Sequence, residues 1–356
     1  MQTLPLGASP VRVSRVIHGC MGFSDDRAAA IRAMHASFDA GVTSFDTAPL
    51  YGFGRNEETL ADAIADRRAR VQVLTKLGLR WDAEHGRVLF EAVERDGARK
   101  VVRRDSRAVS VKLEVERSLA RLRVDALDLV QVHHRDLDTP IAETMAALEA
   151  LVREGKVRAV GVSNYSGSEL EEAAARLGGT PLASAQLEYS LLARGIETDQ
   201  LPWARGRGVA VLAYSPLAHG VLAGRQLGAR AAPADWRRGT VYFSPQNLAA
   251  INGALAGAAL PIAAARGVDV AQVCLAWVLA QPGVTAVIAG AGTPEQACAN
   301  VAAAALNLEP PEVESLSSAF GRIVLAPPPS AGGGVFGRVR GLLSRLRDVA
   351  TSVKER

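Results

Sequence analysis

The chain has 356 residues, of which 48% are hydrophobic and 22% charged, so it can bury a large core and is not a disordered polymer. Residues 327–356 hold six basic and two acidic side chains, which account for the whole net charge of +4. The rest of the chain therefore has no net charge, which argues against a basic nucleic-acid-binding face there. The three cysteines, Cys20, Cys274 and Cys298, lie far apart without ligand spacing, which excludes a disulfide framework and a structural zinc site.

Eight apolar, often β-branched runs of strand length recur along the chain. They cover residues 16–22, 43–48, 71–77, 127–134, 157–164, 182–190, 209–216 and 285–292. Amphipathic stretches lie between them, among them residues 27–41, 111–125, 141–156 and 271–283. Apolar strands that alternate with helices predict a parallel sheet covered by helices, and eight of them favour a closed (β/α)8 TIM barrel over an open Rossmann sheet. We therefore expect a single α/β domain over residues 1–325.

One segment interrupts this repeat after the third predicted strand. Residues 79–108 are too many for an ordinary connection in a compact domain. Such a segment is usually a lid or a binding loop, and a disordered loop is the alternative.

The C-terminus also departs from the repeat. Residues 326–334 form a Pro/Gly-rich linker, and residues 335–356 predict a basic amphipathic helix. Its apolar stripe consists of Val335, Val339, Leu342, Leu346, Val349 and Val353. Docking onto the barrel, contact with a second copy of the chain in a homo-oligomer, capture of a partner and attachment to an anionic membrane surface all remain open for this helix.

Four polar residues lie at or just after the ends of predicted strands, where barrels of this class place their active sites. They are Asp46, Tyr51, Lys76 and His133. Each has a structural alternative, such as a turn cap or a core histidine, but a lysine flanked by apolar strand residues loses solvation unless it is paired. Together they fit carbonyl reduction. Tyr51 would donate the proton once Lys76 lowers its ordinary pKa of about 10, Asp46 would hold the lysine charged, and His133 would hydrogen-bond the substrate oxygen.

Several segments resemble the signature segments of the aldo-keto reductase family. They are FDTAPLYG, LTKLG, LDLVQVHHRD, VRAVGVSNYS, SAQLEYSLL, VLAYSPLAHGVLAGR and GAGTPEQ, in this order along the chain. The resemblance implies an NAD(P)-dependent oxidoreductase with a catalytic tetrad at Asp46, Tyr51, Lys76 and His133. The 79–108 segment resembles an insertion found in some bacterial members.

The same resemblance implies a set of cofactor-binding residues. Ser163, Asn164 and Gln186 would hold the nicotinamide carboxamide, Tyr214 would stack on the ring, and Ser215, Leu217 and Gly220 would cover the pyrophosphate. Met21, Gly290, Gly292, Gln296 and Asn300 complete the set. The residues alone also predict part of it, because Thr293-Pro294-Glu295-Gln296 reads as a capping box, and a helix N-terminus is an anion site.

The resemblance favours NADP(H), but the chain has no lysine or arginine at residues 290–296, where relatives that prefer NADP(H) usually carry one. NAD(H) is therefore the alternative. For the substrate pocket we expect Trp81, Phe90 and His134, with anchoring of the insertion as the alternative for the first two.

The predicted reaction is reduction of an aldehyde, ketone or keto-sugar. The alternatives are a sugar or alcohol dehydrogenase that works in the oxidative direction, a cofactor-binding regulatory subunit, and a metallohydrolase using His133, His134 and Asp136. We favour no metal site. The N-terminal sequence lacks a signal-peptide core, and no uninterrupted apolar run approaches the roughly 18 residues that a membrane span needs, so we expect a cytoplasmic protein.

Overall fold

The computed structural model describes residues 1–21, 26–93, 97–225, 227 and 236–327. Within these ranges, eight parallel strands close into a barrel in chain order, which confirms the predicted (β/α)8 architecture. The strands are β3 (Val16–Gly19), β4 (Ser44–Asp46), β5 (Gln72–Leu77), β9 (Leu129–Val132), β10 (Val160–Ser163), β11 (Leu182–Glu188), β12 (Ala210–Tyr214) and β13 (Val284–Gly290).

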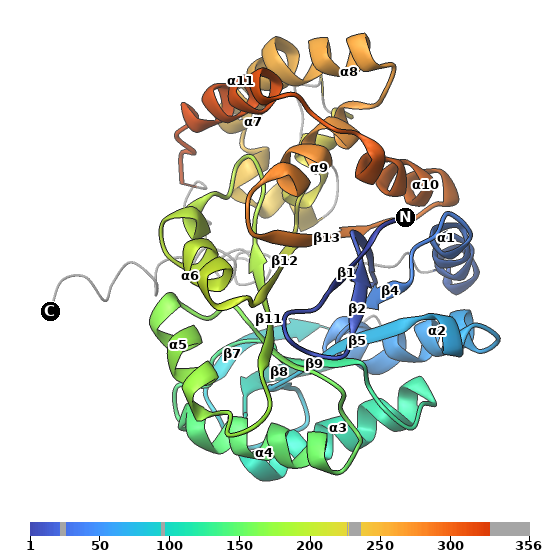
Figure 1. The fold of residues 1–356 in the computed structure, drawn as a ribbon, viewed down its shortest axis with the longest axis vertical. Helices are drawn as coiled ribbons and strands as arrows, with labels where there is room; N and C mark the ends of the chain where they lie inside the picture. The colour runs from blue at the N-terminus through green and yellow to red at the C-terminus, as the bar shows by residue number, and fades with distance from the viewer. Residues whose placement is uncertain (22–25, 94–96, 226, 228–235, 328–356) are drawn as a thin grey trace, which may run out of the picture.

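Helices surround the barrel and cover its outer face (Figure 1). They are α1 (Arg27–Asp39), α2 (Arg55–Ile64), α3 (Ala108–Leu122), α4 (Ile141–Arg153), α5 (Gly167–Arg176), α6 (Gln200–Arg207), α7 (Pro245–Ala254), α8 (Leu260–Arg266), α9 (Val270–Ala280), α10 (Pro294–Ala302) and α11 (Pro310–Gly321). Their buried faces and the outward side chains of the strands form the larger hydrophobic core, as expected for a parallel sheet covered by helices. The helices expected over 27–41, 111–125, 141–156 and 271–283 are all present, as α1, α3, α4 and α9.

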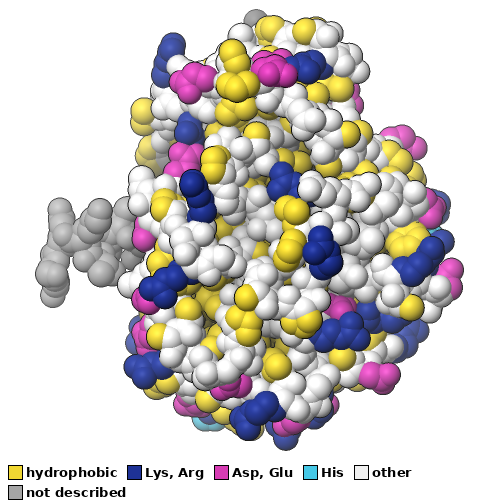
Figure 2. Space-filling model, in the orientation of Figure 1, with side chains coloured by type: hydrophobic (Ala, Val, Ile, Leu, Met, Phe, Trp, Pro, Cys, Tyr) yellow, Lys and Arg dark blue, Asp and Glu magenta, His cyan; other side chains and the backbone are white. Residues whose placement is uncertain are grey.

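A short hairpin closes the N-terminal end of the barrel. Strands β1 (Thr3–Pro5) and β2 (Arg12–Ser14) pair antiparallel and lie in front of the barrel in Figure 1. Leu6 and Val13 pack against inward-facing side chains such as Leu74, in a second, smaller core inside the barrel. On this face, basic and acidic side chains are interspersed (Figure 2). Because the hairpin fills the N-terminal end of the barrel, a polar site can open only at the opposite end, where the strands have their C-termini.

The 79–108 insertion has regular structure of its own. Strands β6 (Leu79–Arg80), β7 (Val88–Val93) and β8 (Arg99–Arg104) form an antiparallel sheet in the order β6-β8-β7. The disordered-loop alternative is therefore wrong for the described residues of this segment, whereas its role as a lid or binding loop stays a prediction. Residues of β7 pair with residues of β8 across the ladder, from Val88 with Arg103 to Val93 with Arg99, and the length of the segment alone did not reveal this pairing.

The stretch from Pro245 to Arg266 is apolar and long enough to cross a membrane, judged by length and composition alone. It consists of α7, a π-helical turn over Leu255–Ala259, and α8. Leu248, Ile251 and Leu255 bury one face of this stretch in the outer core, so it packs as one of the helices around the barrel. The predicted linker begins at the described residues 326 and 327, whereas the predicted helix over 335–356 lies outside the described residues.

Candidate active site

The four candidate catalytic residues come from three neighbouring strand ends. Asp46 is the last residue of β4, Lys76 lies near the end of β5, and His133 follows β9, with its backbone N–H donating to Leu77 O at 2.9 Å. Because side chains alternate along a strand, Lys76 points the same way as Leu74, which belongs to the inner core. The lysine therefore projects into the barrel at its C-terminal end.

Lys76 and Asp46 form a buried ion pair. Lys76 Nζ lies 2.5 Å from Asp46 Oδ1 and also donates to Thr47 O at 3.1 Å, and both side chains are almost completely buried. The second carboxylate oxygen of Asp46 accepts from Gln186 Nε2 at 2.8 Å. Burial by itself would lower the pKa of Lys76, but the Asp46 carboxylate and Tyr51 raise it above its ordinary value. The ammonium is thus held charged, in place and shielded from water.

Tyr51 lies directly beside this pair. It begins a turn in which Gly52 and Phe53 adopt positive φ, and Lys76 Nζ lies 5.0 Å from the centre of its ring. Burial raises the pKa of the Tyr51 phenol, and the Lys76 charge lowers it only in part. The expectation that Lys76 makes the phenol more acidic than usual is therefore wrong for the net effect, because loss of solvation outweighs the nearby charge.

His133 and His134 complete the cluster. The His133 ring meets the Tyr51 ring edge-on at 5.8 Å and stacks on His134 at 5.4 Å. Burial, with the Lys76 charge, holds the pKa of His133 well below its usual range. Both imidazoles are thus neutral at physiological pH, since burial lowers the pKa of His134 to about 3. A neutral imidazole can still donate one hydrogen bond to an oxygen atom.

The residues expected around a nicotinamide ring line the neighbouring strand ends. Asn164 follows β10 at a φ of 60° and accepts from the Tyr214 hydroxyl at 2.8 Å through its Oδ1. Its Nδ2 donates to His133 O at 3.0 Å, which ties this side chain to the cluster. Ser163 is buried and donates to Gln186 O at 2.9 Å. The side chain of Gln186 is engaged by Asp46, so it stabilises the ion pair in this structure.

The residues expected at the phosphate end lie beyond β12 and β13. Ser215 and Gly220 both have positive φ, and Leu217 lies between them in the turn that follows β12. Positive φ at a non-glycine residue stores strain, which is typical of ligand-binding loops. Met21, after β3, is 52% exposed.

The start of α10 differs in detail from the predicted capping box. Thr293 does cap the helix by accepting from the backbone N–H of Gln296 at 3.3 Å. The side chain of Gln296, however, accepts from Gly292 N at 3.0 Å instead of from Thr293 N, so the reciprocal bond of the box is not the one expected. Asn300 holds the preceding turn from the other side, by donating to Gly290 O at 3.1 Å.

Gly290 and Gly292 leave this turn open to a ligand. A methyl group built on either glycine would meet its nearest protein atom at 3.6 Å and 3.8 Å, which is ordinary contact, and neither has positive φ. The protein itself therefore does not demand glycine at these two positions. The bare backbone beside a capped helix N-terminus instead fits an anionic group that approaches the main chain closely.

The chain is similar to known proteins along most of its length. The profile described as Aldo/keto reductase family matches residues 15–320. The NADH-specific methylglyoxal reductase of Escherichia coli is 32% identical over 86% of this chain and 95% of its own length. The uncharacterized oxidoreductase YrpG of Bacillus subtilis is 33% identical over 90% of this chain and 96% of its own. The structure of the glycerol dehydrogenase AKR11B4 from Gluconobacter oxydans superposes with a TM-score of 0.80, at 32% identity over 93% of this chain and 99% of the other.

The chain belongs to the aldo/keto reductase family. It is therefore an NAD(P)-dependent oxidoreductase, and a nicotinamide cofactor with a small carbonyl substrate fits the family.

In this aldo/keto reductase, Trp81 and Phe90 of the insertion, both expected in the substrate pocket, lie in different surroundings. The Trp81 ring packs edge-on against Phe53 at 5.4 Å, and Phe53 is two residues from Tyr51. Phe90 is half-buried on β7 opposite Val102. Its place in the small sheet favours the alternative that it anchors the insertion.

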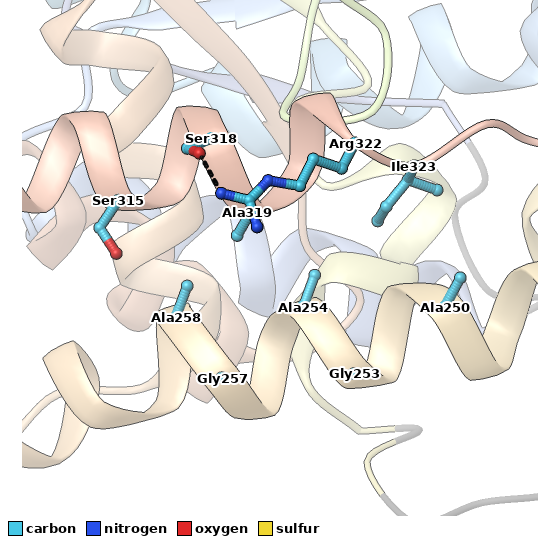
Figure 3. A pocket seen from close by; sticks show the side chains of 10 residues that line it. All are labelled: Ala250, Gly253, Ala254, Gly257, Ala258, Ser315, Ser318, Ala319, Arg322 and Ile323. Atoms are coloured by element: carbon cyan, nitrogen blue, oxygen red, sulfur yellow. Dashed lines mark hydrogen bonds between the residues drawn. The ribbon is translucent and has the colours of Figure 1, made fainter.

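The metallohydrolase alternative finds no support in the described part of the reductase, where no three potential ligands gather. The Asp136 carboxylate accepts from Ser106 N at 3.0 Å and from the Thr139 hydroxyl at 2.6 Å, and so stabilises a turn. A hollow of about 420 Å³ lies elsewhere, between α7 with its π-helical turn and α11 (Figure 3). Small side chains line it, among them Ala250, Ala254 and Ala258.

Sequence reasoning missed several residues that support the site. Glu57, fully buried at the start of α2, accepts from the Thr75 hydroxyl at 2.7 Å and pairs with Arg121 at 2.6 Å. This network braces β5 immediately before Lys76. The sequence gives no clear signal for this network, because Glu57 is one of two adjacent acidic residues after Tyr51 and only the structure shows that it is buried. The insertion residue Arg104 was also missed, since nothing in its sequence context distinguishes it from the surrounding arginines.

Proposed function

We propose that this chain reduces an aldehyde, ketone or keto-sugar carbonyl, with Tyr51 as the general acid. The observation that carries the proposal is the buried Lys76–Asp46 pair beside the Tyr51 ring, with neutral His133 at the edge of that ring. A bound nicotinamide cofactor supplies the hydride that reduces the carbonyl carbon. The protein supplies the proton and the polar environment around the carbonyl oxygen.

Each residue has a separate task in this proposal. Because burial raises its pKa, Tyr51 stays protonated near neutrality and can give its proton to the carbonyl oxygen as negative charge develops there. Lys76 stabilises the phenolate that remains, and Asp46 keeps the ammonium oriented. His133 donates a hydrogen bond to the same oxygen and, being neutral, does not compete as an acid.

We propose that Asn164, Ser163 and Tyr214 bind the nicotinamide end of the cofactor, and that Gly290 and Gly292 receive its phosphates. The open glycine turn at the capped start of α10 supports this assignment. Ser215, Leu217 and Gly220 form the turn across the same end of the barrel and belong to the proposed set, as do Met21, Gln186, Gln296 and Asn300.

Family frequency is the reason to expect NADP(H), but two observations favour NAD(H). Glu295 lies in the first turn of α10, and a hydrogen bond from Thr293 lowers its pKa, so the proposed phosphate end carries a carboxylate and has no lysine or arginine at residues 290–296. One relative is also named NADH-specific. We therefore propose NAD(H) as the working cofactor, with NADP(H) as the alternative to be tested.

The experiment is a fluorescence titration of the purified protein with NADH and NADPH, followed by turnover of butanal. Tyr51→Phe and Lys76→Met should retain cofactor binding and lose turnover by about 10²- to 10⁴-fold, the usual contribution of a positioned acid. Tyr189→Phe is the matched control, because the Tyr189 hydroxyl is bound by Glu197 at 2.7 Å, away from the cluster. Failure of both cofactors to bind would refute the proposal.

The oxidative direction is a second candidate. The related structure is named a glycerol dehydrogenase, and the same tetrad can remove a proton from an alcohol while hydride leaves the carbon. Turnover of glycerol with NAD⁺, compared with butanal and NADH, separates the two. The regulatory-subunit alternative predicts tight cofactor binding with no turnover in either direction.

We also propose a cytoplasmic location and keep the sequence-based division into a barrel over 1–325, a linker over 326–334 and a helix over 335–356. Homo-oligomer formation through this helix is testable by deletion of residues 328–356 and sedimentation. An unchanged mass would end the dimer hypothesis.

A further inference from the structure

Arg104 is the last residue of β8 and brings a guanidinium to the edge of the active site. It lies opposite Leu79 in the β6–β8 ladder, and the next residue, Asp105, donates through its backbone N–H to Gly78 O at 3.2 Å. Gly78 is two residues beyond Lys76. The insertion therefore attaches Arg104 beside the C-terminal ends of the barrel strands.

The guanidinium of Arg104 has no hydrogen-bond or ion-pair partner among the described residues. It is half-buried, and its Nε is fully buried without an acceptor. Three other arginines of the insertion are paired: Arg80 with Asp82 at 3.0 Å, Arg87 with Asp138 at 2.8 Å, and Arg103 with Gly86 O at 3.1 Å. A desolvated donor without an acceptor costs free energy, so Arg104 has donors available for a ligand.

Two carboxylates, Asp136 and Glu169, act electrostatically on Arg104, but both accept hydrogen bonds from other groups. Asp136 accepts from the backbone of Ser106 and the hydroxyl of Thr139, and Glu169 caps α5 by accepting from Ser166 N at 2.8 Å. Burial lowers the pKa of Arg104, and these two carboxylates offset the effect only in part. The positive charge thus remains available to a further anion.

Arg104 lies on the side of the candidate site marked by His134. Its charge contributes to the lowered pKa of His134, after burial, and His134 stacks on His133, whose ring meets Tyr51. His134 Nε2 also lies 3.4 Å from Asn164 Nδ2. Phe53, two residues from Tyr51, forms an aromatic pair with Trp81. The cluster therefore borders an aromatic pair and, next to His134, a cation that has no hydrogen-bond or ion-pair partner among the described residues.

We propose that Arg104 binds a carboxylate group on the substrate, so that the preferred substrates are aldehydes or ketones that carry a second, anionic end. The inference rests on the proposed carbonyl reduction at Tyr51. A planar guanidinium matches a carboxylate in a two-bond fork, and a partly desolvated site strengthens that contact. Arg104 is a specificity residue and takes no part in the proton or hydride transfer.

The test compares two substrates that differ in one charged group, succinic semialdehyde and butanal, with the cofactor that binds. In the wild type we expect a higher kcat/KM for the semialdehyde. Arg104→Met should lower the ratio of the two kcat/KM values by about 10- to 100-fold, mainly through KM of the semialdehyde, as expected for loss of one charge-assisted contact. Arg104→Lys should retain part of the preference, because it keeps the charge without the fork.

Arg99→Met is the matched control, since Arg99 is exposed at the other end of the same strand. It should leave both kcat/KM values as in the wild type. A second measurement is the inhibition of butanal reduction by succinate, compared between the wild type and Arg104→Lys. This comparison tests binding of a carboxylate while the positive charge at residue 104 is retained.

The outcomes separate this inference from the proposed function. A wild type that reduces butanal but shows no preference for the semialdehyde, or an unchanged ratio in Arg104→Met, overturns the role of Arg104 and leaves carbonyl reduction standing. A wild type that reduces neither compound with either cofactor overturns the proposed function itself.

Discussion

Glu114, near the candidate active site, allows a test of how the burial of an ionisable group changes the pH dependence of the free energy of unfolding. This residue of α3 is buried and accepts a hydrogen bond from Gly78 N at 2.9 Å, two residues beyond Lys76. Burial raises its pKa from 4.5 to about 8, and the bond from Gly78 opposes the rise only in part. Replacement with glutamine keeps an acceptor for Gly78 and removes the ionisable proton.

The direction in which the free energy of unfolding changes with pH depends on which state, folded or unfolded, binds the Glu114 proton more tightly. Between pH 4.5 and about pH 8 the folded state keeps Glu114 protonated, whereas the unfolded chain ionises it. The folded state then binds more protons, so the free energy of unfolding falls as the pH rises, by about 1.4 kcal/mol per pH unit. Over the roughly 3.5 pH units between the two pKa values, the loss amounts to about 5 kcal/mol.

The assay is urea unfolding of the wild type and Glu114→Gln across this pH range. We expect the two proteins to differ least at the acidic end and Glu114→Gln to become the more stable one as the pH rises. The control is Glu116→Gln, on the same helix but at the surface beside Lys156, which should follow the pH slope of the wild type. Parallel profiles for the wild type and Glu114→Gln would refute the reasoning.

Two further predictions concern the barrel seam and the candidate site. Arg15 donates to the carbonyl oxygens of Val284 and Thr285, both at 3.0 Å, where β13 meets β3 to close the barrel, and to Leu279 O of α9 at 2.6 Å. Arg15→Met should lower the free energy of unfolding, measured in urea, by about 2–4 kcal/mol, whereas Arg12→Met, at an exposed residue, should change it little. Equal losses in the two variants would contradict this prediction. For His133, the lowered pKa predicts that log kcat/KM for butanal has no inflection near pH 6.5, because the imidazole is already neutral there. An inflection near that pH that disappears in His133→Gln would show that the imidazole titrates.

The sequence was sufficient for the architecture, and it singled out four polar residues that the structure brings together. Apolar runs of strand length that alternate with helical periodicity require a helix-covered parallel sheet, and eight of them form the barrel found here. The same local rule explains Lys76, since a charged residue near the end of an apolar strand must find a partner, and Asp46 ends the adjacent strand. These inferences need only side-chain alternation and the cost of burying a charge.

Only the tertiary structure decided which groups meet across long sequence separations. It pairs Gln186 with Asp46, gives the insertion its own sheet, and leaves the buried Nε of Arg104 without an acceptor among the residues that the structure describes. It also reverses the expected shift of the Tyr51 pKa, because desolvation depends on every neighbouring element and not on Lys76 alone. Local sequence patterns indicate whether a segment is a helix or a strand, whereas the burial of a side chain and its hydrogen-bond partners depend on how all the elements pack together.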